Sequence, residues 1–256
     1  MIRELTAIEE LHRAAELLAG IWGLPPDRGP VTPELLRALA HSGNYVAGAW
    51  DGGALVGASA GFLGRHQNSL HLHSHISGVD PAHQGRHVGL ALKRHQRAWA
   101  AGRGVATIEW TFDPLVRRNA YFNLAKLGAR IVGYEPHFYG AMRDAVNAGD
   151  ETDRAVVRWD VDSGDPRPQE PAGVVVLRPD DDGAPVVDKS DATQLRVWVP
   201  QDIVDVRRRD PELGLAWRSA LRDTMGAAVS DGYSAVGMSR DGWYTLVRAT
   251  TTVVDR

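Results

Sequence analysis

Five of the chain's ten histidines lie within residues 71–92, HLHSHISGVDPAHQGRHVGLAL, where a histidine-rich run precedes a glycine-containing turn. In a strand, His71, His73 and His75 share one face, because successive side chains alternate between the two sides. Three imidazoles on one face suit a metal ion or form a polar surface. A catalytic zinc needs three ligands and groups that orient them, and no carboxylate precedes Asp80 here. We therefore favour a polar strand face and expect no metal site.

The second half of this stretch has the features of an anion-binding turn. Asp80 and Pro81 end the strand, and an amphipathic helix follows residues 84–89, QGRHVG. The first amides of a helix lack partners within it, and the helix dipole favours a negative charge there, so a phosphate can bind. Glycines allow close approach of the backbone, and an arginine adds charge. The residues expected to bind the phosphate are Gln84, Gly85, Arg86, His87, Val88 and Gly89.

The elements that position these residues are predicted from the apolar pattern. Thr6 and Glu9 form a capping box before a first helix, and Thr32 before Pro33 starts a second. Asp51-Gly52-Gly53 joins two strands as a hairpin, because its glycines supply the positive φ of such a turn. The other expected elements are strands at 2–5, 44–50, 54–62, 70–79, 105–112 and 129–137, and helices from 88 to Gly102 or Gly104 and from 117 to 127.

A boundary is predicted at 161–173, which is rich in Asp, Pro and Gly and lacks periodicity. Residues 1–160 then form one domain and 174–256 a C-terminal α/β extension. In the extension we expect strands near 174–177 and 195–199, a helix from Asp210 and Pro211, and a hairpin at Asp241-Gly242. Arg207, Arg208 and Arg209 form either a solvated face or a site for a carboxylate, such as that of a succinyl donor.

Composition narrows the classes of function. The 256 residues carry a net charge of −3, so nucleic acid is not the expected partner and a small molecule is. There is no cysteine, which excludes disulfides, thiolate zinc sites and a cysteine nucleophile. The N-terminus lacks the apolar core of a signal peptide, and no run of about 18 apolar residues occurs. We expect a cytoplasmic protein without membrane contact; the oligomeric state stays open, a homodimer included.

The order of these motifs resembles the GNAT acyltransferase superfamily over about residues 1–160. Residues 84–89 look like that family's pyrophosphate loop, and KLGA at 126–129 looks like its KLGF ending. The whole chain, with TFDPL at 111–115 and RNAYFNLAKLGA at 118–129, resembles a bacterial branch with a C-terminal extension. The resemblance implies a mixed α/β (α+β) fold, with a mostly antiparallel central sheet flanked by helices and the extension packed on it. It also implies acetyl-CoA or another acyl-CoA as co-substrate, with no metal.

The resemblance also implies roles for particular residues. The strand carrying Gly78 and Val79 is expected to splay from the next one and to bind the pantetheine arm, and an N–H near Val79 to stabilise the oxyanion. Asn119 and Asn123 are expected to face coenzyme A. Two positions depart from the family pattern. His87 stands where a glycine is usual, and Leu124 stands where many members place the tyrosine that protonates the leaving thiolate, which leaves Tyr121 as a substitute.

The attacking amine must be neutral, so the site needs a base. Glu109, in the apolar strand VATIEWTF, is the first candidate: a carboxylate facing the cleft is desolvated, which raises its pKa. The alternative is a strand-face acid paired with an arginine. His75 is the rival base, because it lies closest to the splay and histidine titrates in the required range.

Three functions compete. An acyl-CoA-dependent N-acyltransferase would move an acetyl or other short acyl group, such as succinyl, to the amine of a small molecule or amino acid. A non-catalytic module for acyl-CoA or acyl-carrier protein would bind coenzyme A but release no thiol with any amine. A metal-dependent hydrolase would use the histidine run and hold a metal. The first is favoured.

Overall fold

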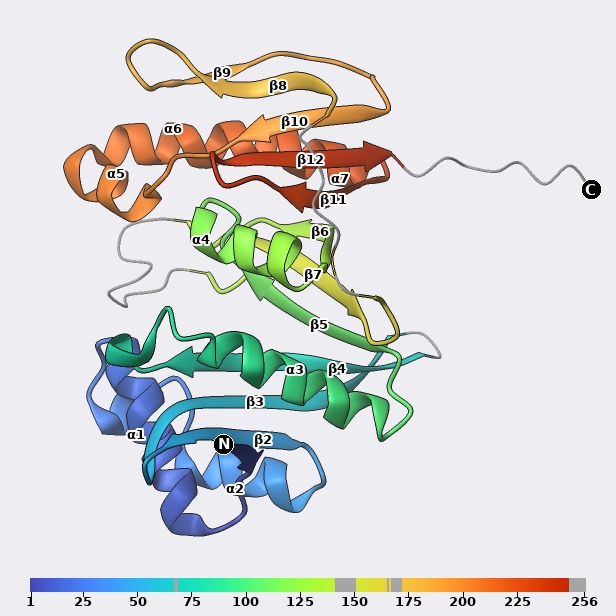
Figure 1. Cartoon of the computed structure of the whole chain (residues 1–256). Coiled ribbons are helices and arrows are strands. Elements are labelled where there is room, and N and C mark those ends of the chain that lie inside the picture. Colours follow the sequence, from blue (N-terminus) through green and yellow to red (C-terminus); the bar gives the residue numbers. More distant parts are fainter. Residues whose placement is uncertain (67–68, 141–150, 165, 167–171, 249–256) are drawn as a thin grey trace, which may run out of the picture. The chain divides into compact units, whose positions relative to one another are not determined.

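The computed structural model describes residues 1–66, 69–140, 151–164, 166 and 172–248. The chain divides into two compact units (Figure 1). Among the described residues, the first unit comprises Met1–Trp110 and 160–163, and the second comprises the rest. The division falls at residues 110 and 111. The predicted boundary at 161–173 lies partly outside the described residues and stays a prediction.

The first unit is built on a sheet of strand order β1-β2-β3-β4-β5. Neighbouring strands are antiparallel except β4 and β5, which run parallel. The β2–β3 connection is the predicted hairpin, with Gly52 at φ +54° and Gly53 at φ +88°. The strands are β1 (Ile2–Glu4), β2 (Tyr45–Asp51), β3 (Ala54–His66), β4 (Ser69–Val79) and β5 (Thr107–Phe112).

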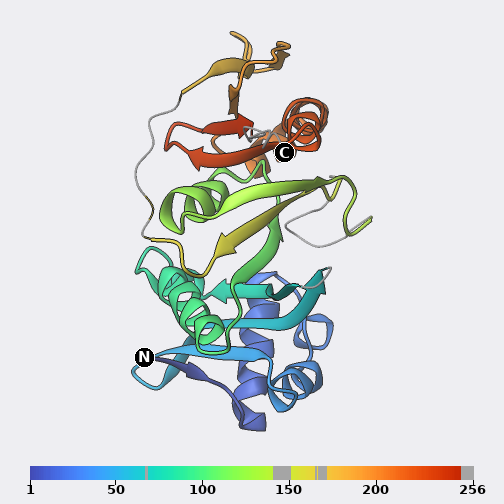
Figure 2. The ribbon, with the colours of Figure 1, turned by 90° about the vertical axis from the view of Figure 1, so that its right-hand side faces the viewer.

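Helices cover both faces of this sheet. A Cβ atom on Gly78 would meet Ile21 and Leu18 of α1, whereas one on Gly57 would meet Leu92 and Val88 of α3. Figure 2 shows α1 and α3 on opposite sides of the sheet. The helices are α1 (Ile8–Ile21), α2 (Pro33–His41) and α3 (Val88–Ala101), with 3-10 turns at Pro26–Arg28 and Pro81–His83.

The two predicted helix caps had different outcomes. The Thr32 hydroxyl accepts a hydrogen bond from the Leu35 N–H at 3.2 Å, as expected before Pro33. The capping box at Thr6 is wrong: α1 begins at Ile8 after Ala7, without a side-chain cap. The Leu5 N–H still bonds to the Val46 carbonyl, so the chain leaves the sheet too late for Thr6 to cap.

The second unit has its own strands, in the order β7-β6-β11-β12-β10-β8-β9. Its only parallel pairing within the described part is β8 with β10. The strands are β6 (Arg130–Glu135), β7 (Arg154–Asp160), β8 (Val174–Pro179), β9 (Pro185–Val187), β10 (Gln194–Trp198), β11 (Tyr233–Met238) and β12 (Trp243–Arg248), and the helices are α4 (Arg117–Ala120), α5 (Ile203–Arg209), α6 (Pro211–Leu221) and α7 (Ala227–Ser230), with π-helical turns at Tyr121–Lys126 and Arg222–Gly226.

Several local predictions in this unit are confirmed and others needed correction. Asp210 caps α6 by accepting from the Leu213 N–H at 2.9 Å, and Gly242 forms the last hairpin turn at φ +99°. The expected helix at 117–127 is α-helical only to Ala120 and then widens into a π-helix, which apolar spacing does not reveal. Strand β7 and helix α5 were not predicted.

The fold class is confirmed: both units contain mixed, mostly antiparallel sheets flanked by helices. Their cores are apolar; one cluster in the first unit joins Leu11 and Leu18 of α1 with Ala58 of β3 and Ile76 of β4. No helix in the described ranges has the length and apolarity needed to cross a membrane.

Candidate functional site

Strands β4 and β5 part after a short pairing. Their parallel ladder consists of Leu72 with Ile108 and His73 with Glu109, although β4 continues to Val79 and β5 to Phe112. We call the point after the His73/Glu109 pair the fork. Beyond the fork, β4 is paired with β3 on one side only. The sequence predicted this splay at Gly78 and Val79, and the structure begins it five residues earlier.

The free edge of β4 presents main-chain groups. Bonded and non-bonded pairs alternate in an antiparallel ladder. Because the Asp80 N–H donates to the Val56 carbonyl, the Val79/Gly57 pair is a non-bonded one, and Val79 directs its N–H and C=O away from β3. The Gln84 amide group donates to that Val79 carbonyl at 3.2 Å. An extended ligand with amide groups can therefore hydrogen-bond along this edge as an added strand would.

The turn at 80–87 leads directly from this edge to α3. Asp80 closes it by accepting from the Ala82 N–H at 2.7 Å. Gly85 has φ +77° and His87 has φ +62°, both in the left-handed region. Glycine adopts this region without strain, which explains why the family pattern has glycine where this chain has His87. These two left-handed residues, separated by Arg86, curl the backbone toward the first turn of α3.

The start of α3 is open to solvent and suits an anion. Gln84, Gly85, Arg86 and His87 are exposed, and His87 forms no side-chain cap. The first backbone hydrogen bond at this end of the helix is donated by the Ala91 N–H to the His87 carbonyl. The amides before Ala91 therefore have no acceptor within the helix and can bind a ligand. A Cβ atom on Gly89 would lie 3.7 Å from Val79, an ordinary contact. The strand, turn and helix form in the predicted order, and phosphate binding by residues 84–89 stays a prediction.

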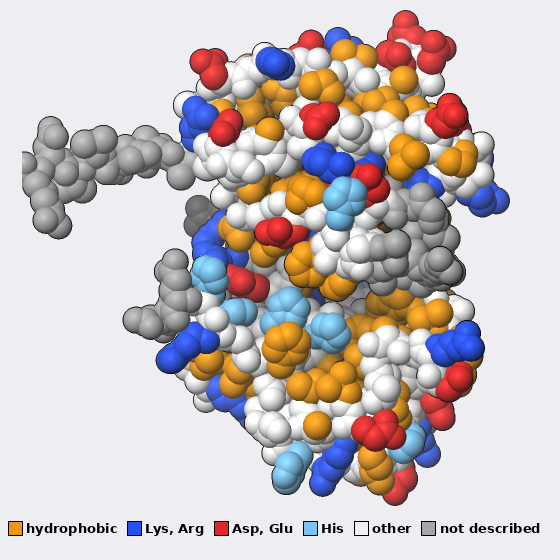
Figure 3. All heavy atoms as spheres, turned by 180° about the vertical axis from the view of Figure 1, so that it is seen from behind, with side chains coloured by type: hydrophobic (Ala, Val, Ile, Leu, Met, Phe, Trp, Pro, Cys, Tyr) orange, Lys and Arg blue, Asp and Glu red, His pale blue; other side chains and the backbone are white. Residues whose placement is uncertain are grey.

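The histidines and Glu109 gather on one face of the first unit. His73 stacks on Phe62 with ring centroids 4.9 Å apart, and the His75 ring lies 6.2 Å from that of His73. The His71 Nε2 atom is 4.0 Å from a Glu109 carboxylate oxygen. The expectation of one shared face is therefore confirmed. Figure 3 shows histidine side chains gathered beside apolar ones.

Two of these histidines, His73 and His75, are biased toward the neutral form. Burial, with smaller effects of His75 and His71, lowers the pKa of His73. Burial also lowers the pKa of His75. A neutral imidazole accepts a proton, so His75 has the chemistry of a base, and the carboxylate of Glu109 is a second group of that kind on this face.

Sequence reasoning missed Lys93, on the opposite face. Its side chain is 6% exposed, and burial lowers its pKa from 10.5 to about 7. Its ammonium group donates to Ser74 at 2.8 Å and lies 3.8 Å from the Trp110 ring centroid. The signal available in the sequence was its spacing: Lys93, Gln96 and Ala100 recur on the buried face of α3.

Tyr121, Asn119 and Asn123 belong to the second unit. The Tyr121 hydroxyl accepts a hydrogen bond from Arg240 Nε at 3.1 Å, which lowers the pKa of Tyr121. Asn119 is exposed, whereas Asn123 is buried and its carbonyl accepts from the Ala129 N–H. Their predicted roles with coenzyme A stay predictions.

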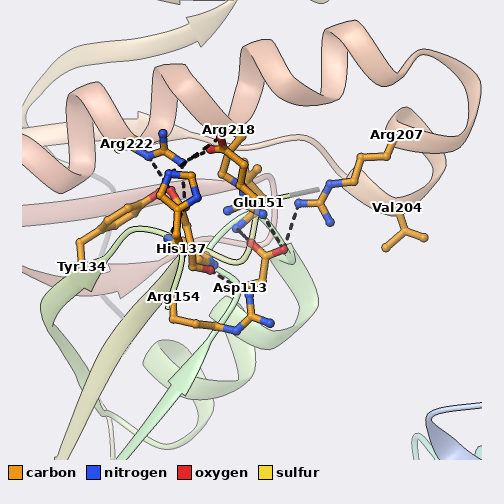
Figure 4. Close-up of polar contacts among 12 residues, drawn as sticks. Asp113, Tyr134, His137, Glu151, Arg154, Val204, Arg207, Arg218 and Arg222 are labelled. Atoms are coloured by element: carbon orange, nitrogen blue, oxygen red, sulfur yellow. Dashed lines mark hydrogen bonds and ion pairs between the residues drawn. The ribbon is translucent and has the colours of Figure 1, made fainter. Parts of the chain in front are cut away.

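The arginines of the extension take different roles. Arg207 and the buried Arg218 bond to Asp113 at 3.0 and 2.8 Å (Figure 4). Although burial opposes ionisation, these two arginines hold the pKa of Asp113 below its usual value. Arg208 and Arg209 instead pair with Asp205 at the surface. The solvated-face reading therefore applies to two of the three predicted arginines.

One further cluster has the residue types of a metal site. Ligand atoms of His137, Glu151 and Asp153 lie within 4.8 Å of one another. Arg222 bonds to both Asp153 oxygens at 2.9 and 2.7 Å and also to Glu151, and Tyr134 donates to Asp153 (Figure 4). A guanidinium thus already neutralises the carboxylates that a cation would need, so we assign this cluster to structure.

Comparison with known proteins agrees with this geometry. Residues 11–129 match the acetyltransferase (GNAT) family. The chain is 43% identical over 78 residues to the N-alpha-acetyltransferase RimI of Mycobacterium tuberculosis, a match that spans 30% of this chain and 48%, about half, of the relative.

Solved structures are similar in fold. The ribosomal-protein-S18-alanine N-acetyltransferase of Escherichia coli aligns with TM-score 0.50 at 15% identity over 64% of this chain and 95% of its own. A GNAT-family protein from Desulfovibrio desulfuricans aligns with TM-score 0.50 at 15% identity over 63% and 98%. At such identities the likeness is one of fold. Residues 11–129 thus match the GNAT acetyltransferase family, and the resemblance that the sequence motifs indicated is confirmed over that part of the chain.

Proposed function

We propose that this protein is an acyl-CoA-dependent N-acyltransferase. The observation that carries the proposal is the continuity of three features: the open edge of β4 after the fork, the left-handed turn at Gly85 and His87, and the free first turn of α3. An edge of main-chain groups suits the two amides of a pantetheine arm. A curled turn ending at a helix N-terminus suits a pyrophosphate.

In the proposed reaction a thioester supplies the activated acyl carbon. This chain binds and orients the two substrates and moves the protons. The acceptor nitrogen forms a bond to the acyl carbon, the carbon–sulfur bond breaks, and the sulfur leaves as a thiolate that takes a proton from water to become the thiol. We assign the Val79 N–H, which points away from β3, to the oxygen that becomes negative. Glu109 takes the proton of the attacking amine directly or through water, and His75 is the second candidate for this step.

The acceptor is proposed to be the primary amine of a small molecule or amino acid. Phe62, His73 and His75 form an aromatic surface beside the single carboxylate of Glu109, which fits a cationic amine attached to a compact body. The similarity to an N-alpha-acetyltransferase favours a second candidate, the N-terminal amine of a protein. Thiol release with free amino acids and with a short peptide beginning with alanine separates the two acceptors.

Coenzyme A binding tests the proposal directly. We expect saturable binding to the full chain in calorimetry. Gly89→Glu should abolish binding through negative charge and bulk at the start of α3, while the circular dichroism spectrum stays unchanged, because Gly89 has no close neighbour except Val79. The matched control is Gly20→Glu, the same change at an exposed helical glycine with no neighbour within 4 Å. Equal affinity of Gly89→Glu and the unsubstituted protein would contradict the site.

Glu109→Gln tests the base. The substitution keeps the shape and removes proton acceptance, so kcat/KM should fall about 10²-fold at pH 7. The deficit should narrow toward pH 9, where the free amine becomes abundant, and coenzyme A affinity should not change. A uniform loss across pH with weaker coenzyme A binding would mark Glu109 as a structural residue, and unchanged rates would leave His75→Ala as the variant to test.

A further inference from the structure

Lys93 connects three elements at the fork. Its Nζ atom donates to Ser74 Oγ of β4 at 2.8 Å and to Gln96 Oε1 of α3 at 3.3 Å, and it lies 3.8 Å from the Trp110 ring centroid on β5. Ser74 and Trp110 each follow directly after the last paired residues, His73 and Glu109. They are the residues that would pair next if the ladder continued.

An irregularity in β4 places Ser74 within reach of Lys93. The β3–β4 register shifts between the Ala60/Ile76 and Phe62/His73 pairs, so Ser74 and His75 together oppose Gly61. The extra residue changes which face the following side chains occupy. A Cβ atom on Gly61 would lie 2.6 Å from the His73 carbonyl oxygen, so the close approach at this bulge requires glycine.

Burying the Lys93 amine costs folding free energy, which suggests that the arrangement is kept for a role other than stability. Lys93, Ser74, Trp110 and Gln96 are exposed by 6%, 5%, 6% and 0%. Among the described residues no carboxylate pairs with Lys93, and burial lowers its pKa to about 7. An apolar residue would fill this space without the cost of desolvating an amine.

We propose that Lys93 is a positioning residue that fixes where β4 and β5 part. It thereby sets the inner end of the acyl-CoA slot, by which we mean the open edge of β4 beyond the fork. This inference rests on the proposed function, because the slot is assigned from it. Hydrogen bonds to β4 and α3 and the contact with the indole on β5 hold both strands to one helix at the fork. Without the amine, both the hydrogen bond to Ser74 and the contact with the Trp110 ring are lost, and with them the link that holds the fork in place.

Ligand binding should change the pKa of Lys93 by removing water near the amine and not by the charge of the ligand. The exposed turn that would hold the pyrophosphate lies at the end of β4, roughly 16 Å from Ser74 at 3.3 Å per residue, which exceeds the Debye length of about 8 Å. Filling the slot removes water near the amine and lowers the pKa of Lys93 further. The groups in contact with Lys93 are Ser74, Gln96 and Trp110, none of which titrates in this range, and His73 on the other face of β4 acts on it only through its charge.

Selective labelling of lysine gives a direct readout, because Lys93, Lys126 and Lys189 are the only lysines of the sequence. With ¹³C at Cε, the full chain gives three signals, and the Lys93→Met variant assigns one of them. Saturation with coenzyme A should move the Lys93 signal and lower its titration midpoint. The signals of Lys126 and Lys189, both exposed, should stay in place.

Calorimetry with coenzyme A measures the consequence. Lys93→Met should weaken binding about 10-fold, while Lys189→Met, the same chemical change at an exposed site, leaves it unchanged. Between pH 6 and pH 8 the unsubstituted protein should gain affinity relative to Lys93→Met by about 3-fold or more, because the bound form favours the neutral amine. A lysine that only stabilised the fold would give no such difference.

The outcomes separate this inference from the proposed function. If coenzyme A binds and Gly89→Glu abolishes binding, but Lys93→Met binds equally well and the Lys93 signal does not move, the role of Lys93 is wrong and the proposed function stands. If the unsubstituted protein binds no coenzyme A, the proposed function fails and this inference fails with it.

Discussion

Lys93 in the first unit and Arg218 in the second are both buried cations, and each unit compensates the charge differently. Arg218, 1% exposed, bonds to the carboxylate of Asp113, so both groups stay ionised. Lys93 has a hydroxyl, an amide and an indole as partners, and its pKa falls to about 7. A paired guanidinium fixes a charge permanently, whereas a buried amine without a carboxylate can lose its proton near neutral pH.

The largest expected effect comes from breaking the fixed pair. Asp113→Asn leaves the buried Arg218 and the nearly buried Arg207 without their carboxylate, which should reduce the free energy of unfolding by about 3–5 kcal/mol. Urea unfolding measures it. Asp205→Asn, which removes the surface partner of Arg208 and Arg209, should cost less than about 1 kcal/mol. Equal costs at the two aspartates would show that burial does not distinguish them.

Replacing Lys93 should change the pH dependence of stability more than the stability itself. The folded pKa of Lys93 lies near 7 and its ordinary value is 10.5, so between these values the unfolded chain binds the extra proton and stability rises with pH. Lys93→Met should lack this rise, which amounts to a difference on the order of a few kcal/mol across the window. Below pH 7 the variant should be at least as stable as the unsubstituted protein.

Thermal unfolding at pH 6, 7.5 and 9 measures this difference. Lys189→Met provides the baseline for removing an exposed lysine. Parallel pH curves for Lys93→Met and the unsubstituted protein would mean that the folded Lys93 keeps an ordinary pKa.

The smallest expected effect concerns the single hydrogen bond from the Lys93 amine to Ser74. Ser74→Ala removes an acceptor from the Lys93 amine and should cost about 1 kcal/mol at pH 6, where the amine is charged. At pH 9 the cost should be smaller, and the Lys93 titration midpoint should fall. Chemical unfolding and the lysine NMR signal measure the two quantities; a midpoint that rises would show that Ser74 does not stabilise the ammonium form.

Short-range patterns predicted much of the local structure. Thr32 before Pro33, Asp51-Gly52-Gly53 and Asp210 before Pro211 each specify a cap or turn through atoms a few residues apart, and all three form as expected. The capping box at Thr6 failed because hydrogen bonding to β2 continues to Leu5, the residue directly before Thr6. A local capping tendency does not form where a hydrogen bond between distant residues competes with it.

The candidate site was predicted in part. The turn at 84–89 and the shared face of His71, His73 and His75 follow from composition and from the two-residue period of a strand. The pairing of Glu109 with His73, which brings the carboxylate beside His71, depends on the parallel register of β4 and β5. No local pattern encodes the register between strands separated by a helix.

By itself the sequence determined the strand, turn and helix around Gly85 and Gly89, because glycine conformations and helix-end amides are local properties. Only the tertiary structure decided where β4 and β5 part, which face Ser74 occupies, and that Lys93 of α3 is buried against both strands. The physical reason is that burial and strand register are set by residues far apart in the chain: the bulge opposite Gly61 turns Ser74 toward α3, and the enclosed position of Lys93 lowers its pKa.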